Sequence, residues 1–306
     1  MEILIDASGA GIGGIGIILE EIIKNWPASD DLLIIGITRK RASNLGRRSE
    51  GTLRIITVSE TRALGLIKTF YAAYRNSRTV DKVLSISPSL TSLVYRTKCT
   101  LIVHDFMYID APEFVPKPKR LYRKASNYVS LAKSINLIFV SETTKKRYLT
   151  IYKNHSKDLK VINPSCELKV KTKEIEAIKK AIQHEKKIVV VPAHSSNKGM
   201  AHIEKCLPYL RNDLTIVLLT GNTQYKISSV IPGQIEILSW ISDEEYSWLL
   251  RNASCMVFVS DYEGYGIPVI EAREVGLPLI ISRDPALMET AKGYGAVVDP
   301  RSPIEL

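Results

Sequence analysis

Short, continuously apolar runs alternate with longer amphipathic segments along this chain. The apolar runs are rich in Val, Ile and Leu and lack the strict polar–apolar alternation of a sheet with one face in water. Such runs predict parallel strands covered on both faces, and the amphipathic segments between them predict the covering helices. The predicted strands are 3–6, 32–37, 53–58, 83–87, 100–103, 137–140, 187–191, 214–219, 235–238, 255–259, 279–281 and 296–298.

The chain is long enough for two domains. It has 306 residues, and its hydrophobic content of 45% suffices for two packed cores. The strand–helix rhythm breaks between Asn163 and Thr172, in a polar stretch without periodicity. We therefore predict two doubly wound, Rossmann-like α/β domains, residues 1–163 and 164–306, which face each other across a cleft.

Charge is distributed unevenly between these two predicted domains. Residues 1–163 carry 26 Lys and Arg against 14 Asp and Glu, a net charge of +12, whereas residues 164–306 carry −2. A strongly basic half is expected to face an anionic partner. In Lys117–Lys124, and around Tyr71, Tyr74, Arg75 and Arg78, the basic residues mix with Leu and Tyr. This mixture indicates docking on an anionic membrane surface, with a merely solvated basic face as the alternative.

Nucleic acid is not an expected partner. The basic runs Arg39–Arg48 and Lys117–Lys124 are not accompanied by a recognition motif. Residues Met1–Asp6 lead straight into a strand pattern, so no secretory signal is expected. No window approaches the roughly 18 apolar residues of a membrane span. Together these features predict a cytoplasmic protein that is peripheral on the membrane.

The segment Val257–Ala272 carries the most specific chemistry. A buried strand ends at Ser260, a glycine-rich loop follows, and Pro268 stands where a helix begins. This order aims backbone N–H groups at one point and predicts an anion site suited to a diphosphate. Glu271, one turn into the helix, can accept hydrogen bonds from both hydroxyls of a ribose. Glu263 opens the loop, where a sugar attached to the diphosphate would lie.

The stretch from Glu263 to Glu271, EGYGIPVIE, resembles a family signature in which two glutamates are separated by seven residues. That family comprises the retaining glycosyltransferases of the two-domain B fold (GT-B), family 4 type, also called glycosyl transferases group 1. Similar landmarks of the family occur at 101–105, 140–145, 161–164, 218–221 and 238–245.

The resemblance implies roles for individual residues. Glu271 would hold the ribose, His104 would lie beside the reacting carbon, and Lys198 would neutralise the diphosphate leaving group. By the same resemblance, the catalytic residues are His104, Lys198 and Glu263, and the donor contacts are Gly14, Gly16, Lys198, Ile241, Glu263, Gly264, Tyr265, Gly266 and Glu271.

Two departures from the family pattern affect these expectations. A basic residue usually stands about five positions before the lysine, but here Ala193 occupies that place, followed by His194. Stabilisation of the leaving group then rests more heavily on Lys198, or His194 assists it. The sequence ends at Leu306, where relatives continue with further helices, so we expect the fold to lack its final C-terminal helices.

The predicted reaction moves a hexosyl group from a UDP- or GDP-linked sugar to a hydroxyl with retention at the anomeric carbon. The expected acceptor is a polyprenyl-diphosphate-linked glycan or a polysaccharide, in cell-surface glycan synthesis such as that of lipopolysaccharide and O-antigen. The chain has no Asp-x-Asp motif and no His/Cys/Asp cluster at ligand spacing. We therefore expect a metal-independent hexosyltransferase with no cofactor other than its donor substrate.

The first glycine-rich loop is also compatible with a different enzyme class. Gly9-x-Gly11-x-x-Gly14 and Gly11-x-Gly13-x-x-Gly16 both match the dinucleotide fingerprint after the first strand. The next strand ends in the basic run 39–41, which would suit a 2′-phosphate. An NADP-dependent reductase is thus the alternative, although it leaves the segment from Glu263 to Glu271 unexplained.

Overall fold

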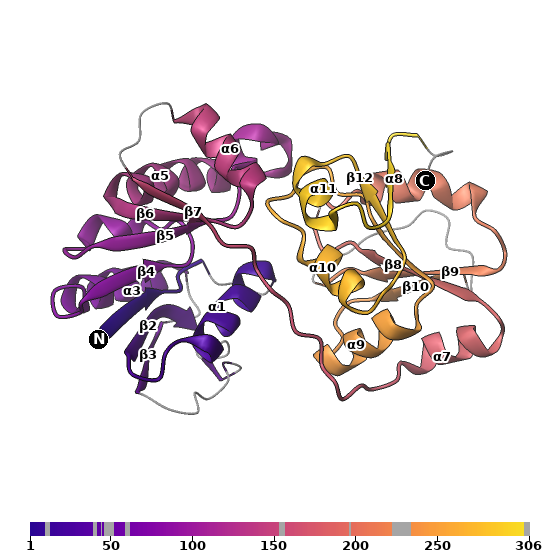
Figure 1. Ribbon diagram of the computed structural model, residues 1–306, viewed down its shortest axis with the longest axis horizontal. Helices are drawn as coiled ribbons and strands as arrows, with labels where there is room; N and C mark the ends of the chain where they lie inside the picture. Colours follow the sequence, from indigo (N-terminus) through magenta and orange to yellow (C-terminus); the bar gives the residue numbers. More distant parts are fainter. Residues whose placement is uncertain are drawn as a thin grey trace. The chain divides into compact units, whose positions relative to one another are not determined.

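The computed structural model describes residues 1–9, 13–38, 42–43, 45, 52–58, 62–152, 157–195, 197–221 and 234–302. The chain divides into two compact units, Met1–Ser165 and Cys166–Leu306 (Figure 1). Each unit has its own parallel sheet with helices packed against it, so the predicted fold class of two Rossmann-like α/β domains is confirmed.

The first unit is built on a seven-stranded parallel sheet in the order β3-β2-β1-β4-β5-β6-β7. The order reverses between β1 and β4, which makes their carboxyl ends the topological switch point of a doubly wound sheet. The strands are β1 (Glu2–Asp6), β2 (Asp31–Thr38), β3 (Leu53–Val58), β4 (Lys82–Ser85), β5 (Cys99–Val103), β6 (Ser134–Phe139) and β7 (Asp158–Val161).

Local signals explain where several helices of this unit begin. Ser141 accepts a hydrogen bond from the backbone N–H of Thr144 and so caps the helix that follows it. Pro118 lies in the first turn of another helix, where its missing N–H costs nothing. The helices are α1 (Gly14–Asn25), α3 (Arg62–Asn76), η1 (Leu90–Val94), α4 (Met107–Asp110), η2 (Pro112–Phe114), α5 (Lys117–Lys133) and α6 (Glu142–Ile151).

The second unit repeats the arrangement with six parallel strands, in the order β10-β9-β8-β11-β12-β13. Here the order reverses between β8 and β11. The strands are β8 (Lys187–Pro192), β9 (Leu214–Leu219), β10 (Ile235–Leu238), β11 (Cys255–Phe258), β12 (Leu279–Ser282) and β13 (Ala296–Val298). The helices are α7 (Glu176–Gln183), α8 (Met200–Cys206), η3 (Leu207–Tyr209), α9 (Asp243–Asn252), α10 (Ile267–Glu274) and α11 (Pro285–Ala291).

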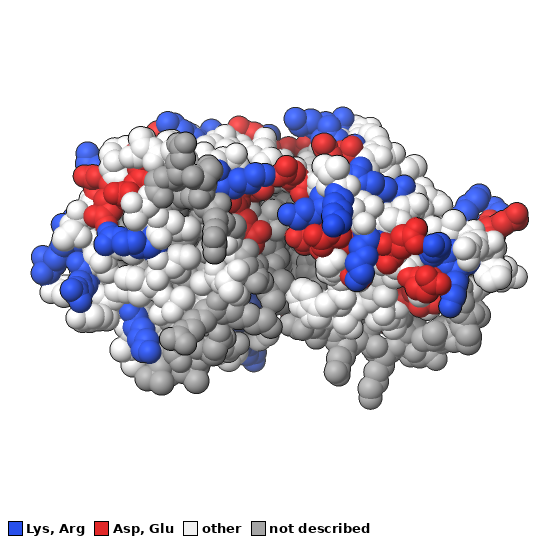
Figure 2. Space-filling model, turned by 90° about the horizontal axis from the view of Figure 1, so that it is seen from below, with Lys and Arg blue, Asp and Glu red and all other residues white. Residues whose placement is uncertain are grey.

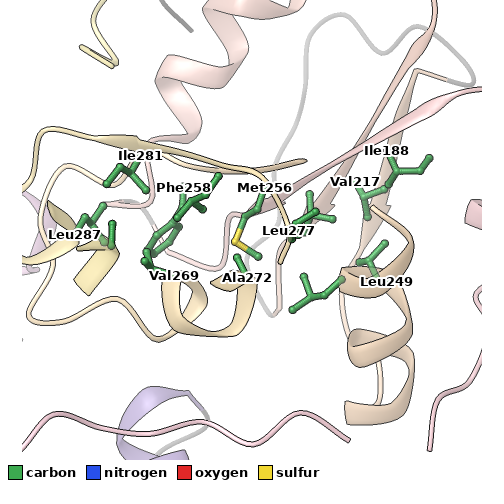
Figure 3. Close-up of a cluster of buried hydrophobic side chains, with 14 of the residues drawn as sticks. Ile188, Val217, Leu249, Met256, Phe258, Val269, Ala272, Leu277, Ile281 and Leu287 are labelled. Carbon is green, nitrogen blue, oxygen red and sulfur yellow. The ribbon is translucent and has the colours of Figure 1, made fainter. Parts of the chain in front are cut away.

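The core of the second unit fixes the position of α10. Met256 and Phe258 on β11 are fully buried and pack with Val269 and Ala272 on α10 (Figure 3). Because both faces of the sheet are covered, its central strands need apolar residues at successive positions, which accounts for the continuous runs. The loop between β11 and α10 is thereby held at both ends by buried residues.

None of the helices in the described ranges is long and apolar enough to span a membrane.

Candidate active site

A buried ion pair marks the switch point of the second unit. Lys198 follows β8, Glu263 follows β11, and these two strands are neighbours in the sheet. The Lys198 ammonium Nζ donates to Oε1 of Glu263 and lies 4.7 Å from the centroid of the Phe258 ring. Both side chains are only 10–11% exposed. Since buried charges must be paired, an arriving anion would compete with Glu263 for the ammonium group.

Asn197 joins the two loops that carry this pair. Its side-chain amide donates to the carbonyl of Tyr262 at 2.9 Å and to Oγ of Ser260 at 3.4 Å. Its own carbonyl accepts from Oγ of Ser260 at 2.7 Å and from the backbone N–H of Asp261 at 2.8 Å. Four hydrogen bonds therefore hold the lysine loop against the glutamate loop.

Gly199 allows this close approach. Its φ of 72° is in the left-handed region, and a Cβ built on it would lie 2.0 Å from the carbonyl oxygen of Val259. Any other residue would push the start of α8 away from β11. Lys198 would then move away from Glu263.

The glycine loop enters α10 as the sequence predicts. Gly266 caps the helix with a φ of 100°, and Pro268 lies in the first turn. A Cβ on Gly266 would come within 2.6 Å of Cδ2 of Leu287, so α11 packs directly on this loop. The first N–H groups of a helix lack partners within it and attract anions. The diphosphate site at Gly264, Tyr265 and Gly266 stays a prediction.

Asp284, which precedes α11, holds the start of the glutamate loop by a hydrogen bond. Its Oδ1 accepts from the backbone N–H groups of Ala286 at 2.9 Å and Leu287 at 3.1 Å, which caps α11. Its Oδ2 accepts from the backbone N–H of Glu263 at 3.2 Å. Burial, together with the negative charge of Glu263, raises the pKa of Asp284 to about 6. The N-cap role is readable from Asp-Pro, but the link to Glu263 is not.

Glu271 is the fifth residue of α10 and is buried. The hydroxyl of Tyr246 on α9 donates to its Oε2 at 2.6 Å. Burial raises the pKa of Glu271 to about 7, and burial beside Glu271 raises the pKa of Tyr246 well above its ordinary value. Sequence analysis missed Tyr246, because nothing in its neighbourhood on α9 distinguishes it from a core tyrosine.

The loops after β8, β9 and β10 also meet. A Cβ on Gly221 would lie 3.5 Å from Cβ of His194 and 4.0 Å from Cζ2 of Trp240. Burial, with the nearby charge of Lys198, lowers the pKa of His194 to about 4. His194 is therefore neutral near pH 7 while no anion is bound beside it. Ile241, the predicted neighbour of the nucleobase, is half-buried and packs against the core.

The other predicted site residues belong to the first unit. His104 follows β5, and its Nε2 donates to the carbonyl of Ile86, which leaves Nδ1 without a proton in the neutral ring. Burial lowers the pKa of His104. Gly14 is the exposed first residue of α1, and Gly16 is buried in its first turn. Gly11 and the basic run 39–41 of the reductase hypothesis lie outside the described residues.

Within the described ranges, no three His, Cys, Asp or Glu side chains gather in a way that could hold a metal ion.

The family model described as "Glycosyl transferases group 1" matches residues 171–306, which contain Lys198, Glu263 and Glu271. Residues 171–306 form a glycosyl transferases group 1 domain. The stated resemblance to glycosyl transferases group 1 is thereby confirmed. The retaining mechanism and the roles of the individual residues stay predictions. The reductase alternative has no support from this match or from the similarities below.

Curated proteins that are named mannosyltransferases are similar to this chain at low sequence identity. The O-antigen chain mannosyltransferase B of Escherichia coli is 21% identical over 213 residues, which are 64% of this chain and 56% of that protein. The MMP alpha-(1->4)-mannosyltransferase of Mycolicibacterium hassiacum is 28% identical over 184 residues, 56% of this chain and 44% of that protein. The chain thus spans about half the length of these relatives.

Solved structures share the fold of this chain. The Anabaena protein Alr3699/HepE, crystallised with UDP and glucose, superimposes with a TM-score of 0.76 at 15% identity, covering 100% of this chain and 87% of that one. WaaG, described as a glycosyltransferase involved in lipopolysaccharide biosynthesis, gives 0.68 at 13% identity, covering 99% and 88%. Both neighbours have the GT-B fold expected from the sequence.

Proposed function

We propose that the chain is a retaining hexosyltransferase that uses a nucleoside diphosphate sugar as donor. The observation that carries the proposal is the buried Lys198–Glu263 pair at the carboxyl ends of β8 and β11. It stands beside the glycine loop that opens α10, inside a group 1 transferase domain.

In the proposed reaction, the bond between the anomeric carbon and the diphosphate oxygen breaks. The acceptor hydroxyl oxygen forms its new bond to that carbon on the same face of the sugar. The acceptor proton passes to the departing diphosphate, so no protein base is needed. Lys198 leaves Glu263 and pairs with the diphosphate, whose charge on the bridging oxygen grows in the transition state. Glu263, released from the lysine, accepts hydrogen bonds from the sugar hydroxyls.

The remaining residues hold the donor. The Tyr246 hydroxyl occupies one oxygen of Glu271, and the other oxygen accepts from a ribose hydroxyl. The loop Gly264–Gly266 lies along the diphosphate and sugar, and Ile241 lies beside the nucleobase. In the first unit, unprotonated Nδ1 of His104 can accept a hydrogen bond from a sugar hydroxyl, and Gly14 and Gly16 remain predicted donor contacts.

The donor and acceptor follow from the relatives' names together with the charge of the chain. Two curated relatives are named mannosyltransferases, which favours a mannosyl group, and a structural neighbour was crystallised with UDP and glucose. Both a UDP-linked and a GDP-linked sugar are therefore candidate donors. The acceptor is a polyprenyl-diphosphate-linked glycan or polysaccharide at the cytoplasmic face of a membrane. No metal takes part in the proposed mechanism, because Lys198 supplies the positive charge.

Calorimetry with UDP, GDP, UDP-glucose, GDP-mannose and NADPH tests the proposal. We expect one nucleoside diphosphate and its sugar to bind, in the presence of a chelator as well as in its absence. Lys198→Ala should lose affinity for the nucleoside diphosphate that binds the wild type, whereas its affinity for uridine or guanosine, measured in the same way, should stay close to that of the wild type. Binding of NADPH with no binding of any nucleotide sugar would overturn the proposal. A strict requirement for a divalent ion would overturn its metal-independent part.

A further inference from the structure

Two helices of the first unit expose apolar side chains among basic ones. The sequences of α3 and α5 contain no Asp or Glu. On α3, Ile67, Tyr71 and Tyr74 recur at helical spacing on one side, and Ile67 and Tyr71 are 65% and 63% exposed. The Arg78 guanidinium stacks over the Tyr74 ring at 4.3 Å. The outer side of α3 is thus apolar with a basic edge.

The outer side of α5 has the same character. Lys117, Leu121, Lys124 and Tyr128 recur at intervals of three or four residues and therefore share one stripe. Leu121 and Tyr128 are 71% and 72% exposed. A solvated helix face normally carries charged or polar side chains at such positions, so these two residues indicate a partner.

The 3-10 helix η1 contacts both helices. Both α3 and α5 pack against η1, and Leu93 on η1 is exposed. Arg96, just after η1, lies 5.9 Å from the centroid of the Tyr74 ring. We call the outward side chains of α3, η1 and α5 the basic–apolar face. Figure 2 shows Lys and Arg side chains interspersed with Asp and Glu on the second unit, at its right, and side chains of both signs also occur on the first unit, at its left.

The other side of α5 contacts the edge of the sheet that carries His104. The Arg123 guanidinium lies 3.7 Å from the carboxylate of Asp105, the residue after His104. Tyr122 is hydrogen-bonded at the start of η1, next to Ser89 and Leu90. The Arg123–Asp105 contact therefore joins the second turn of α5 to the segment after β5 that carries His104.

We propose that the basic–apolar face docks on the surface of a bilayer that contains anionic lipids. Leu121, Tyr128, Ile67 and Tyr71 enter the interface between headgroups and acyl chains, while the Lys and Arg side chains reach the lipid phosphates. The inference rests on the proposed function, because it places the His104 edge where a lipid-linked acceptor presents its sugar.

Charge complementarity selects the lipid surface over a second copy of the chain. A two-fold dimer would bring the same face of both copies together. On α3 and α5 that contact would oppose Lys and Arg to Lys and Arg without a single carboxylate from either helix. An anionic leaflet neutralises every one of these charges and accepts the apolar side chains as well.

Co-sedimentation with vesicles tests the docking. We expect binding to vesicles of phosphatidylcholine and phosphatidylglycerol at 7:3 in low salt. At least tenfold weaker binding is expected in high salt or with phosphatidylcholine alone. Leu121→Glu with Tyr128→Glu, and Ile67→Glu with Tyr71→Glu, should each reduce binding at least tenfold. Tyr209→Glu is the matched control, since Tyr209 is 75% exposed but lies in the second unit.

Further measurements distinguish failure of the docking proposal from failure of the proposed function. Circular dichroism confirms that each variant is folded, and calorimetry with the nucleotide that binds the wild type should give the same affinity for all of them. Absence of vesicle binding in a wild-type chain that binds nucleotide overturns the docking alone. Absence of nucleotide binding overturns the proposed function alone. A dimer in light scattering that the same substitutions dissociate assigns the face to a second copy and overturns the inference.

Discussion

The two units share the same strand arrangement at their switch points, but they carry different polar side chains there. In both sheets the strand order reverses beside the first strand, between β1 and β4 and between β8 and β11. In each unit, a glycine that follows the first strand contacts the segment that follows the adjacent strand of the sheet. A Cβ on Gly9 would lie 1.7 Å from Oγ of Ser87, as one on Gly199 would lie 2.0 Å from the oxygen of Val259.

The side chains placed on this arrangement differ. In the first unit the carboxylate of Asp6 is buried and accepts hydrogen bonds from the Ser8 backbone N–H and from the hydroxyls of Ser8, Thr91 and Tyr95. In the second unit the buried carboxylate of Glu263 meets an ammonium group instead. A hydroxyl network satisfies its carboxylate permanently, whereas an ion pair can exchange one partner for an anionic ligand.

The fold alone therefore does not determine which of the two switch points binds a ligand. The switch point of each unit is equally suited to a ligand by its topology. Among the described residues, a buried cation beside a glycine loop and a helix N-terminus is found in the second unit. The first contributes a neutral histidine and a stabilising network. Substitutions at the two polar centres and changes of pH can test that division.

Removing the cation of the second unit should have the largest effect. Lys198→Ala deletes the group that we propose neutralises the leaving diphosphate, and we expect turnover to fall by about 10²- to 10³-fold. Initial rates with the donor identified by calorimetry measure this effect. Lys205→Ala, in the last turn of α8, is the control and should leave turnover unchanged. An equal loss in both variants would remove Lys198 from the mechanism.

Removing the carboxylate of the first unit should affect stability rather than chemistry. Asp6→Ala leaves the donors of Ser8, Thr91 and Tyr95 without their acceptor, at a cost of about 3 kcal/mol in the free energy of unfolding. Urea denaturation measures the loss, and Asp158→Ala, at an exposed position of the same unit, should leave the midpoint nearly unchanged. If folded Asp6→Ala bound nucleotide tenfold more weakly, the division between the two units would be wrong.

Glu271→Ala should weaken nucleotide binding by about ten- to a hundredfold, because a charged hydrogen bond contributes roughly 1.5–3 kcal/mol. Tyr246→Phe, which keeps the carboxylate and deletes its hydroxyl donor, should have a smaller effect of a few-fold. Calorimetry distinguishes the two. Unchanged affinity in Glu271→Ala would place the ribose elsewhere.

The pH dependence of stability gives the smallest effect. Burial raises the pKa of Glu271 from 4.5 to about 7, so the folded chain holds this proton more tightly than the unfolded one. Its contribution to stability is complete below about pH 4.5 and is lost as the pH rises through about 7. Glu271→Gln cannot ionise, so its Tm relative to the wild type should rise by about 5 °C between pH 5 and pH 8. A constant difference in Tm would contradict the buried state of this carboxyl group.

Much of the fold and part of the site could be predicted without coordinates. The continuous apolar runs predict buried parallel strands, and the order of Ser260, two glycines and Pro268 predicts a strand, a loop and a helix start. These signals are local, because backbone conformation and burial on both faces restrict residue types over a few positions. The glutamates of the signature and Lys198 stand in such local motifs.

The partners of these residues could not be predicted. Lys198 and Glu263 are 65 positions apart, Tyr246 and Glu271 are 25 apart, and the backbone of Glu263 meets Asp284 from 21 positions away. Many Lys, Tyr and Asp residues could have filled these places. The choice depends on which strands become neighbours and on the register of their carboxyl ends.

By itself, the sequence determined the alternation of strands and helices, the basic character of the first half and the loop between Glu263 and Glu271. Each of these follows from residue types within a short window or a domain-wide count. Tertiary structure alone decided that Asn197 holds two loops together, that Asp6 accepts hydrogen bonds from three hydroxyls, and that α3 and α5 both pack against η1. Such contacts arise when strands distant in the chain pair side by side, and burial then determines which polar groups find a partner.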